Sequence, residues 1–326
     1  MKLFRFIQRL VPLSYQVRFY KCKPQSSKPR HLICFKQWTA SMVMDIITSA
    51  LNLKCRHVDT HGKRLDVLTN CKVMILQEVN EPILNMAVSK AATFLGAFDV
   101  NIIDHLVWDK DYFGKVFSMM TDVIFVATAT HMCVQRFADQ ATVPVLCMRS
   151  RTHASIQALA TVMAIIEEFG TMKSLNVAYI GAPHPVLNSY LLLCPMLGAN
   201  IRYKCCCKET GGICPLLHKA SEDLTAQTRT ECRECESSQQ VLCNTSVIIS
   251  GPTSCKKEAA KGYKINLRDI EKSTPCEWIF FHTCPRGDEC DDDLFNHCNS
   301  RTFKSFQNMH YITAALMANA VKGLKF

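Results

Sequence analysis

The feature that most constrains this chain is a regular alternation of short apolar segments with longer segments of helical periodicity. The apolar segments have strand length, and the segments after them place apolar residues three and four positions apart. Repeated strand–turn–helix units build parallel sheets that helices cover on both faces. The predicted strands are Lys72–Leu76, Asp122–Val126, Val143–Cys147, Leu175–Gly181, Asn200–Lys204, Val247–Ser250 and Trp278–Phe281; the predicted helices are Leu84–Leu95, His131–Gln140, Ile156–Phe169, one from Val186 that stops at Gly198, and Tyr311–Val321.

The clearest of these helices separates two series of strand–helix units. Its apolar residues recur from Ile156 to Phe169, with Ser155 available as N-cap and Gly170 just past the end. A chain of 326 residues exceeds the size of most single cores. We therefore predict two α/β domains that meet near Gly170–Ser174.

The basic residues are concentrated at the amino terminus. Residues 1–44 carry a charge of +9 with no acid before Asp45, and the whole chain carries +10, so the remainder is near neutral. A near-neutral body gives no reason to expect nucleic-acid binding. The leader interleaves apolar residues with arginines and contains serines, which is typical of a mitochondrial transit peptide; a disordered basic tail is the alternative interpretation. We expect cleavage near His31 and a location in the mitochondrial matrix.

Several segments, correctly ordered and spaced, carry a family resemblance. They are FADQATVPV (Phe137–Val145), IQALA (Ile156–Ala160), LNVAYIG (Leu175–Gly181), VLNS (Val186–Ser189) and HTCPRGDECDDDLF (His282–Phe295). From about residue 32 to the end the chain resembles ornithine carbamoyltransferase, of the aspartate/ornithine carbamoyltransferase family. The resemblance implies an α/β fold of two doubly wound parallel-sheet domains, with a C-terminal helix that crosses back to the first domain. It also implies a homotrimer, with carbamoyl phosphate on the first domain and ornithine on the second.

The composition of the leader and the family resemblance together predict four parts of the chain. Residues 1–31 form the transit peptide, 32–170 the carbamoyl-phosphate-type domain, 171–305 the ornithine-type domain, and 306–326 the helix that packs on the first domain. No apolar segment is long enough to cross a bilayer, which takes about 18 residues, because the longest, Tyr190–Ile201, is too short and contains Pro195.

The carbamoyl-phosphate positions have changed most. The family binds this dianion with a Ser-Thr-Arg-Thr-Arg turn at a helix start, where backbone N–H groups and arginines grip the phosphate. Counting back from Leu95–Gly96, this chain has Glu81, Pro82, Ile83, Leu84 and Asn85 there. An acid followed by proline is ordinary capping, so we interpret the turn as capping its own helix. Two missing arginines lower the affinity by about 10²- to 10⁴-fold.

Other positions that bind ligands in the family have likewise lost their charged or amide side chains in this chain. Two further family arginines correspond to Ala127 and to about Met309. The Asp-Gly-Asn-Asn turn that faces ornithine corresponds to 182–185, Ala-Pro-His-Pro, and the acid that meets the amino group of ornithine corresponds to Gly251.

A few candidate site residues remain in place. His-Pro-x-Gln of the family corresponds to His153 and Gln157, with the histidine one residue upstream; the alternative is a solvent-facing histidine before a helix. With Asn85 they are the candidate substrate-binding residues. The candidate catalytic residues, from the family's His-Cys-Leu-Pro-Arg, are His282, Cys284 and Arg286. The cysteine has moved by one position, and Arg286 has the alternative of pairing with Asp288, Asp291 or Asp292.

Cysteines are unusually frequent, with 19 in the chain. One segment holds Cys205, Cys206, Cys207, Cys214, His218, Cys232 and Cys235. Only one pair has C-x-x-C spacing, whereas a zinc site normally needs two such pairs, so we expect free thiols, no metal and no cofactor.

Three hypotheses about function follow. The leading one is a carbamoyltransferase-fold protein with impaired or lost catalysis that acts as a binding or structural subunit. The second is an active carbamoyltransferase that makes citrulline from ornithine and carbamoyl phosphate, or that uses a changed acceptor. The third is a thiol-based metal or redox protein.

Overall fold

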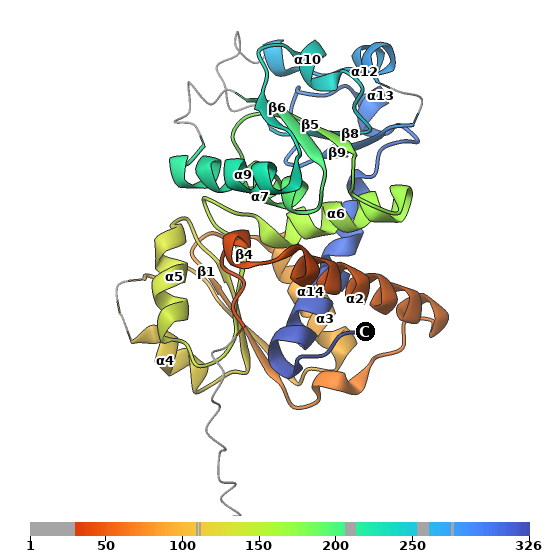
Figure 1. The fold of residues 1–326 in the computed structure, drawn as a ribbon. Helices are drawn as coiled ribbons and strands as arrows, with labels where there is room; N and C mark the ends of the chain where they lie inside the picture. Colours follow the sequence, from red (N-terminus) through yellow and green to blue (C-terminus); the bar gives the residue numbers. More distant parts are fainter. Residues whose placement is uncertain (1–29, 109, 111, 206–212, 253–260, 275–276) are drawn as a thin grey trace, which may run out of the picture.

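Two parallel sheets, each covered by helices on both faces, make up the computed structural model (Figure 1). The structure describes residues 30–326 except 109, 111, 206–212, 253–260 and 275–276. Residues 1–29 of the predicted transit peptide and part of the cysteine-rich segment therefore lie outside the described residues. The predicted α/β fold class, two doubly wound parallel-sheet domains, is confirmed.

The first sheet has the strand order β2-β1-β3-β4. The chain adds β2 on one side of β1 and then β3 and β4 on the other, so the direction of winding reverses between β1 and β3. The elements of this part are η2 (Phe35–Gln37), α2 (Ala40–Asp59), η3 (Asp66–Leu68), β1 (Lys72–Gln77), α3 (Pro82–Leu95), β2 (Asp99–Ile103), α4 (Phe113–Ser118), β3 (Val123–Ala127), α5 (His131–Gln140) and β4 (Val145–Arg149).

The second sheet repeats this plan with the order β7-β6-β5-β8-β9, and its winding reverses between β5 and β8. Its elements are β5 (Asn176–Gly181), α7 (Pro185–Met196), β6 (Asn200–Cys205), α9 (Pro215–Thr228), β7 (Cys232–Glu234), α10 (Ser238–Leu242), β8 (Val247–Ser250), η4 (Lys261–Tyr263), α12 (Leu267–Ser273), β9 (Ile279–His282) and α13 (Asp292–Phe295). Open parallel sheets bind ligands at the carboxyl ends of their strands, at such reversal points.

Alternate residues of the strands enter different cores. In β1, Val73 and Ile75 join the core under α3 and α14, whereas Met74 and Leu76 join the core under α5. This two-residue alternation with apolar side chains on both faces is what a fully covered parallel strand requires. The apolar runs found in the sequence are therefore explained by burial on both sides.

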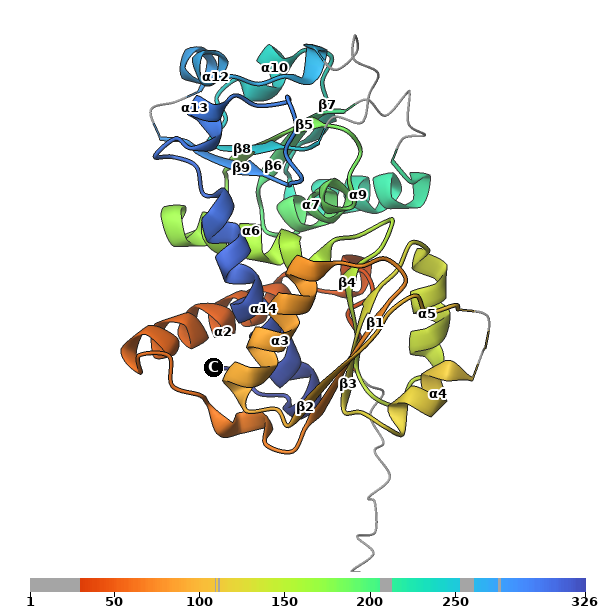
Figure 2. The ribbon, with the colours of Figure 1, turned by 180° about the vertical axis from the view of Figure 1, so that it is seen from behind.

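Two helices join the domains. α6 (Ser155–Phe169) lies between the two sheets, and α14 (Thr302–Lys322) passes α6 and reaches α2 and α3 of the first domain (Figures 1 and 2). The expected crossing of the last helix to the first domain is thus present. It begins at Thr302, nine residues before the predicted start at Tyr311.

Two helices end at the glycines that the sequence predicted, whereas the predicted N-cap of α6 differs from the observed one. Gly96 and Gly170 end α3 and α6 in left-handed conformations, at φ of 86° and 73°. Ser155 was expected to be the N-cap of α6, but this prediction is wrong: Ala154 takes that position, and the Ser155 hydroxyl is buried without a hydrogen-bond partner.

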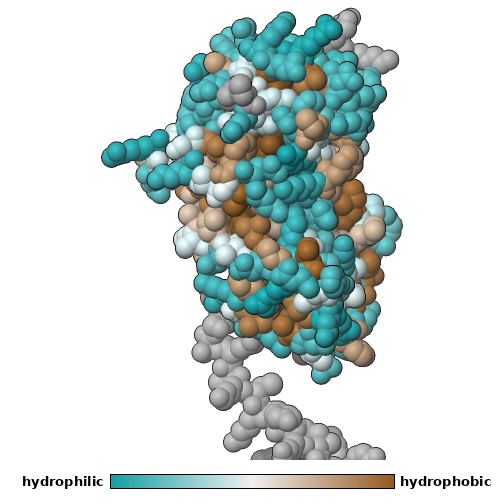
Figure 3. All heavy atoms as spheres, turned by 90° about the vertical axis from the view of Figure 1, so that its right-hand side faces the viewer, coloured by the Kyte–Doolittle hydropathy of each residue, from teal (hydrophilic) through white to brown (hydrophobic). Residues whose placement is uncertain are grey.

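Within the described part of the chain, no helix combines the length and apolar character that crossing a membrane requires. On the face drawn in Figure 3, apolar side chains occur in separate groups interrupted by hydrophilic ones.

Candidate functional site

A cavity of about 480 Å³ lies at the reversal points of both sheets; we call it the cleft. It is lined by residues that follow β1 (Val79, Glu81), end or follow β3 (Ala127, Thr128, Ala129), end or follow β4 (Arg149, Ser150, Arg151) and follow β5 (Pro183, His184, Pro185, Asn188). Both domains contribute, and its volume suits a small molecule. The cleft is therefore the candidate functional site.

The first-domain wall of the cleft is closed by an ion pair. Glu81 is the N-cap residue of α3, but its side chain makes no capping bond to that helix. Instead, Arg149 Nη1 donates to Glu81 Oε1 at 2.5 Å. The expectation that this turn caps itself through its acid is wrong, because the carboxylate is drawn to an arginine from β4. Burial raises the pKa of Glu81, and Arg149 opposes that rise.

Pro82 occupies the first turn of α3 as predicted and has no backbone N–H to offer. Beside it, the Thr128 hydroxyl and the Ala129 N–H both donate to Glu78. Ala127 is buried at the end of β3, and Met309 is buried in α14. Neither position carries an arginine, and Glu81 is the carboxylate that the first domain contributes to the described lining of the cleft.

His184 dominates the second-domain wall. It is the N-cap of α7, and its Nδ1 accepts the N–H of Val186 at 3.2 Å, while Pro185 occupies the next position. Burial, with a contribution from Arg149, lowers the pKa of His184 to about 3. The imidazole is therefore neutral at neutral pH, and because Nδ1 accepts, Nε2 carries the proton. Helix α7 caps its own start, and the ring, which lines the cleft, retains one N–H donor.

Gly251 cannot be replaced by an acid without rearrangement. A Cβ atom at this residue would lie 2.0 Å from the hydroxyl oxygen of Tyr179. That hydroxyl donates to the Ala182 carbonyl at 2.6 Å, which fixes the ring in the buried space. The side chain of Tyr179 thus fills the space that a residue at 251 would need in order to meet an amino group.

The candidate substrate-binding residues lie behind the cleft, and none of them lines it. Asn85 is buried and donates to Gln77 Oε1 at 2.9 Å. Gln157 Nε2 donates to the Thr283 carbonyl at 2.8 Å, which ties α6 to the second domain. Each amide nitrogen thus donates within the chain, whereas Asn85 Oδ1 is buried without a hydrogen-bond partner.

His153 is buried, so the alternative of a solvent-facing histidine is wrong. Its Nε2 lies 3.1 Å from Cys34 Sγ, and its Nδ1 lies 3.4 Å from the Ser189 hydroxyl. Burial lowers the pKa of His153 to about 3. The ring of His153 therefore packs between Cys34, the N-cap of η2, and Ser189 of α7.

The candidate catalytic residues also make structural contacts. His282 Nε2 bonds Glu289 Oε1 at 2.8 Å, and its Nδ1 accepts the N–H of Cys284 at 2.9 Å. Burial raises the pKa of the Cys284 thiol and so disfavours the thiolate. Arg286 pairs with Asp292, one of the three partners considered, and its guanidinium lies 4.6 Å from the centre of the Phe295 ring. None of the three lines the cleft.

The strongest donors in the cleft were missed by the sequence reasoning. Arg149 and Arg151 end and follow the strand that was predicted as Val143–Cys147. Two arginines at the carboxyl end of a parallel strand are a recognisable pattern, since ligands bind there. Asn188, on the first turn of α7, also lines the cleft.

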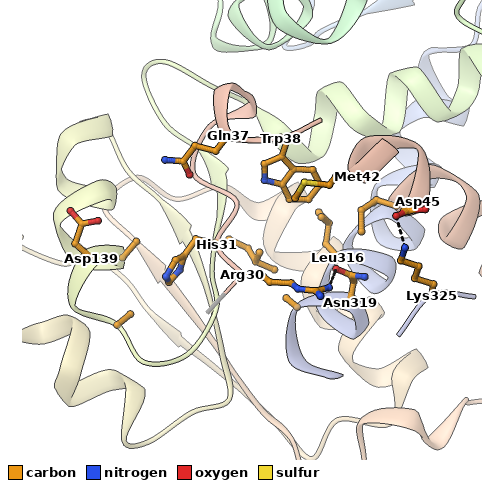
Figure 4. Close-up of a pocket in the computed structure, with 15 residues that line it drawn as sticks. Arg30, His31, Gln37, Trp38, Met42, Asp45, Asp139, Leu316, Asn319 and Lys325 are labelled. Carbon is orange, nitrogen blue, oxygen red and sulfur yellow. Dashed lines mark hydrogen bonds and ion pairs between the residues drawn. The ribbon is translucent and has the colours of Figure 1, made fainter. Parts of the chain in front are cut away.

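A second cavity, of about 720 Å³, lies beyond the outer edge of β4 (Figure 4). Trp38, Met42 and Leu316 give it an apolar wall. Its charged groups are largely satisfied within the chain: Asp45 pairs with Lys325 at 2.6 Å, and Arg30 bonds Asn319. We favour the smaller cleft as the functional site because donors from both sheets converge there.

The cysteine-rich segment is described only in part, because Cys206 and Cys207 lie outside the described residues. Cys232 lies 3.3 Å from the Ser221 hydroxyl, and Cys235 is buried. Among the residues that the structure does describe, no three histidine, cysteine or acidic side chains are placed to hold a metal ion.

Fold and cleft together define a two-domain α/β protein whose candidate ligand site lies between two doubly wound sheets. Residues 173–320 match the family model for the Asp/Orn binding domain of aspartate/ornithine carbamoyltransferase. The chain is 25% identical to ornithine transcarbamylase, mitochondrial, of Gallus gallus over 309 residues, covering 90% of this chain and 86% of the relative. The corresponding values for ornithine carbamoyltransferase, mitochondrial, of Aquarana catesbeiana are 22% over 317 residues, 90% and 87%.

Solved structures give the same result for the fold. Ornithine carbamoyltransferase from Pyrococcus furiosus superposes with a TM-score of 0.84 at 23% identity, over 91% of this chain and 98% of that one. Ornithine transcarbamoylase from Giardia lamblia gives 0.82 at 18% identity, over 92% and 100%. The chain therefore resembles the ornithine carbamoyltransferases in sequence and shares their fold.

Proposed function

We propose that this chain is a carbamoyltransferase-fold protein that does not transfer a carbamoyl group from carbamoyl phosphate to ornithine and acts as a binding or structural subunit. The observation that carries the proposal is the Glu81 carboxylate at the start of α3, held by Arg149 at 2.5 Å. It places negative charge where the resemblance implies the phosphate, and it occupies the nearest arginine.

Binding of a phosphate dianion needs donors that are free to turn toward it. Free backbone N–H groups at a helix start and bidentate arginines meet this need. At the start of α3, Pro82 has no N–H, and the Glu81 N–H is directed to the side chain of Gln77 at 3.3 Å. Repulsion from Glu81 adds to the loss of donors, so carbamoyl phosphate binds weakly or not at all.

The amino-acid side is equally altered. Ornithine carries a cationic amino group that requires an acidic partner. Gly251 has no side chain, and Tyr179 fills the adjoining space. His184 is neutral and caps its own helix. A cationic substrate therefore finds no unpaired carboxylate among the described residues that line the cleft.

A second candidate function is a carbamoyltransferase with a changed acceptor. Arg149 and Arg151 favour it, because a cleft with two arginines accommodates an acceptor that carries negative charge. Such an enzyme would still need a binding site for carbamoyl phosphate, and the carboxylate of Glu81 disfavours binding of that dianion.

We also propose that the protein is a homotrimer in the mitochondrial matrix. Its chain would have four parts: the transit peptide (1–31), the carbamoyl-phosphate-type domain (32–170), the ornithine-type domain (171–305) and the C-terminal helix (306–326). The basic leader and the names of the frog and chicken relatives support import. Sequencing the amino terminus of protein from purified mitochondria tests both import and cleavage near His31. Sedimentation equilibrium of the mature chain tests the trimer.

The proposal is tested by assaying citrulline formation from ornithine and carbamoyl phosphate. Loss of two charge-assisted contacts predicts a rate at least about 100-fold below that of the chicken enzyme assayed alongside. Calorimetric titration with carbamoyl phosphate at low salt shows whether the donor binds. A citrulline rate within tenfold of the chicken enzyme would overturn the proposal, and carbamoyl phosphate binding without citrulline would favour the changed acceptor.

A further inference from the structure

The cleft holds several side-chain hydrogen-bond donors, and the one carboxylate among its described lining residues is paired. Arg151 is exposed at its rim, and Arg149 is half-buried beside it. From the second domain, His184 offers its Nε2–H, and Asn188 offers an amide that can donate. These side chains come from β4 and α7, so the donors lie on two walls of one cavity.

The acids around the cleft are already committed. Glu81 is the only carboxylate among its described lining residues, and it accepts from Arg149. Glu78, in the adjoining loop, accepts from the Thr128 hydroxyl and the Ala129 N–H. With two arginines, one acid and a neutral histidine, the lining carries a net charge of +1. This balance suits a singly charged anion and disfavours a cationic amino acid.

The geometry also separates a carboxylate from a phosphate. A tetrahedral dianion is normally held by backbone N–H groups at a helix start. Here Pro82 and Pro185 have no N–H, and the N–H of Val186 is taken by His184 Nδ1. The remaining first-turn donors of α3, the N–H groups of Ile83 and Leu84, lie next to Glu81 in the chain. The planar fork of an arginine matches a planar carboxylate without help from a helix end. A dianion would also meet Glu81.

From this arrangement we infer that the cleft binds a small monocarboxylate, held by Arg151 and Arg149 on the first domain and by His184 and Asn188 on the second. The inference rests on the proposed function, since it names the ligand class of the same cleft. The ligand shares Arg149 with Glu81, and the volume of about 480 Å³ allows a molecule of metabolite size.

The test uses N-acetylglycine as probe in calorimetric titrations of the full chain at low salt. N-acetylglycinamide, which has the same shape without the charge, is the matched ligand control. The expected result is saturable binding of N-acetylglycine and none of the amide. Arg151→Ala is expected to weaken that binding at least about tenfold, the value of one charge-assisted contact. Arg268→Ala, an exposed arginine on α12 and remote from the cleft, is expected to leave it unchanged.

A second variant keeps the test independent of any effect of Arg151 on folding. Glu81→Gln releases Arg149 and is expected to tighten binding of N-acetylglycine and to allow inorganic phosphate to bind. The inference is overturned if N-acetylglycine does not bind, if the amide binds equally well, or if neither substitution changes the affinity. Citrulline formation is measured separately, so an active enzyme would overturn the proposed function while the titrations still decide the ligand class.

Discussion

The helix pair α6 and α14 differs from the cleft in what its side-chain contacts do. In the helix pair, the Thr161 and Ser305 hydroxyls lie 2.9 Å apart, and Lys54 and Asn308 both bond Glu167. Its apolar side chains are buried in a core that extends into both domains. In the cleft, an acid and an arginine pair across space that a ligand would use.

The difference shows which constraints a fold imposes on its sequence. The helix pair holds two sheets together, so each of its contacts serves stability whatever the protein does. The cleft contributes little to the cores, and its residues can change with function at small cost in stability. Substitutions in the two regions should therefore differ both in the size and in the pH dependence of their effects.

The largest effect is expected from Leu159→Ala in α6. Leu159 is fully buried, and its removal leaves a cavity between helices that join both domains. The free energy of unfolding should fall by about 3 kcal/mol, measured by urea denaturation. The matched control is Leu216→Ala, at a leucine with 71% of its surface exposed, where a change within about 0.5 kcal/mol is expected. Equal effects at the two sites would contradict the role given to α6.

A smaller effect is expected from Glu168→Gln, at the end of the same helix. Arg301 Nε and Nη2 donate to its two oxygens at 2.8 and 3.1 Å, and Lys304 lies 2.8 Å away. Hydrogen bonding to Arg301 lowers the pKa of Glu168 to about 2. After allowance for solvent screening, the substitution should cost about 1–2 kcal/mol at pH 7.

The pH dependence of this loss follows from the lowered pKa. The carboxylate stabilises the folded protein above the ordinary pKa of glutamate, and this stabilisation disappears as the pH falls through about 2. Denaturation curves of the parent chain and of Glu168→Gln should therefore converge between pH 4.5 and pH 2. A constant difference over that range would show that the side chain acts through packing instead of charge.

The smallest effect, and one of opposite sign, is expected from Glu81→Gln in the cleft. Burial raises the pKa of Glu81 in the folded state despite Arg149. Folding thus favours the protonated form of Glu81. The stabilisation that this form gives the folded protein is lost as the pH rises through the pKa of Glu81 in the folded state. The melting temperature of the variant relative to the parent should increase from pH 4 to pH 7. A decrease would mean that the Arg149 ion pair stabilises the fold more than burial of the acid opposes it.

Much of the fold was predictable because burial on both faces makes parallel strands apolar throughout. β1, β3, β5 and β8 were placed to within a residue or two from this property. Helix α2 escaped prediction because its inward apolar residues alternate with lysine, arginine and asparagine. Strand β2 escaped because it lies at the sheet edge and is only partly buried.

The contacts in the cleft were less predictable, because a sequence motif gives the position of a residue along the chain but not the direction in which its side chain points. Pro82 and Pro185 could be placed at helix starts, since proline is tolerated there. The pairing of Glu81 with Arg149 could not, because the two residues are 68 positions apart and meet only through the order of the strands. His153 illustrates the same limit: its position suggested a ligand contact, whereas its ring is enclosed by Cys34 and Ser189.

The return of α14 to the first domain has a consequence for synthesis of the chain. Phe326, the final residue, bonds Ser49 and Asn52 of α2, and α14 packs on α2 and α3. Domains usually fold in order as they leave the ribosome, at about 5–20 residues per second. Here the amino-terminal domain cannot complete its core until the last helix has emerged. Both halves therefore mature together only after α14 has been made, and removal of residues 307–326 would leave the first domain open.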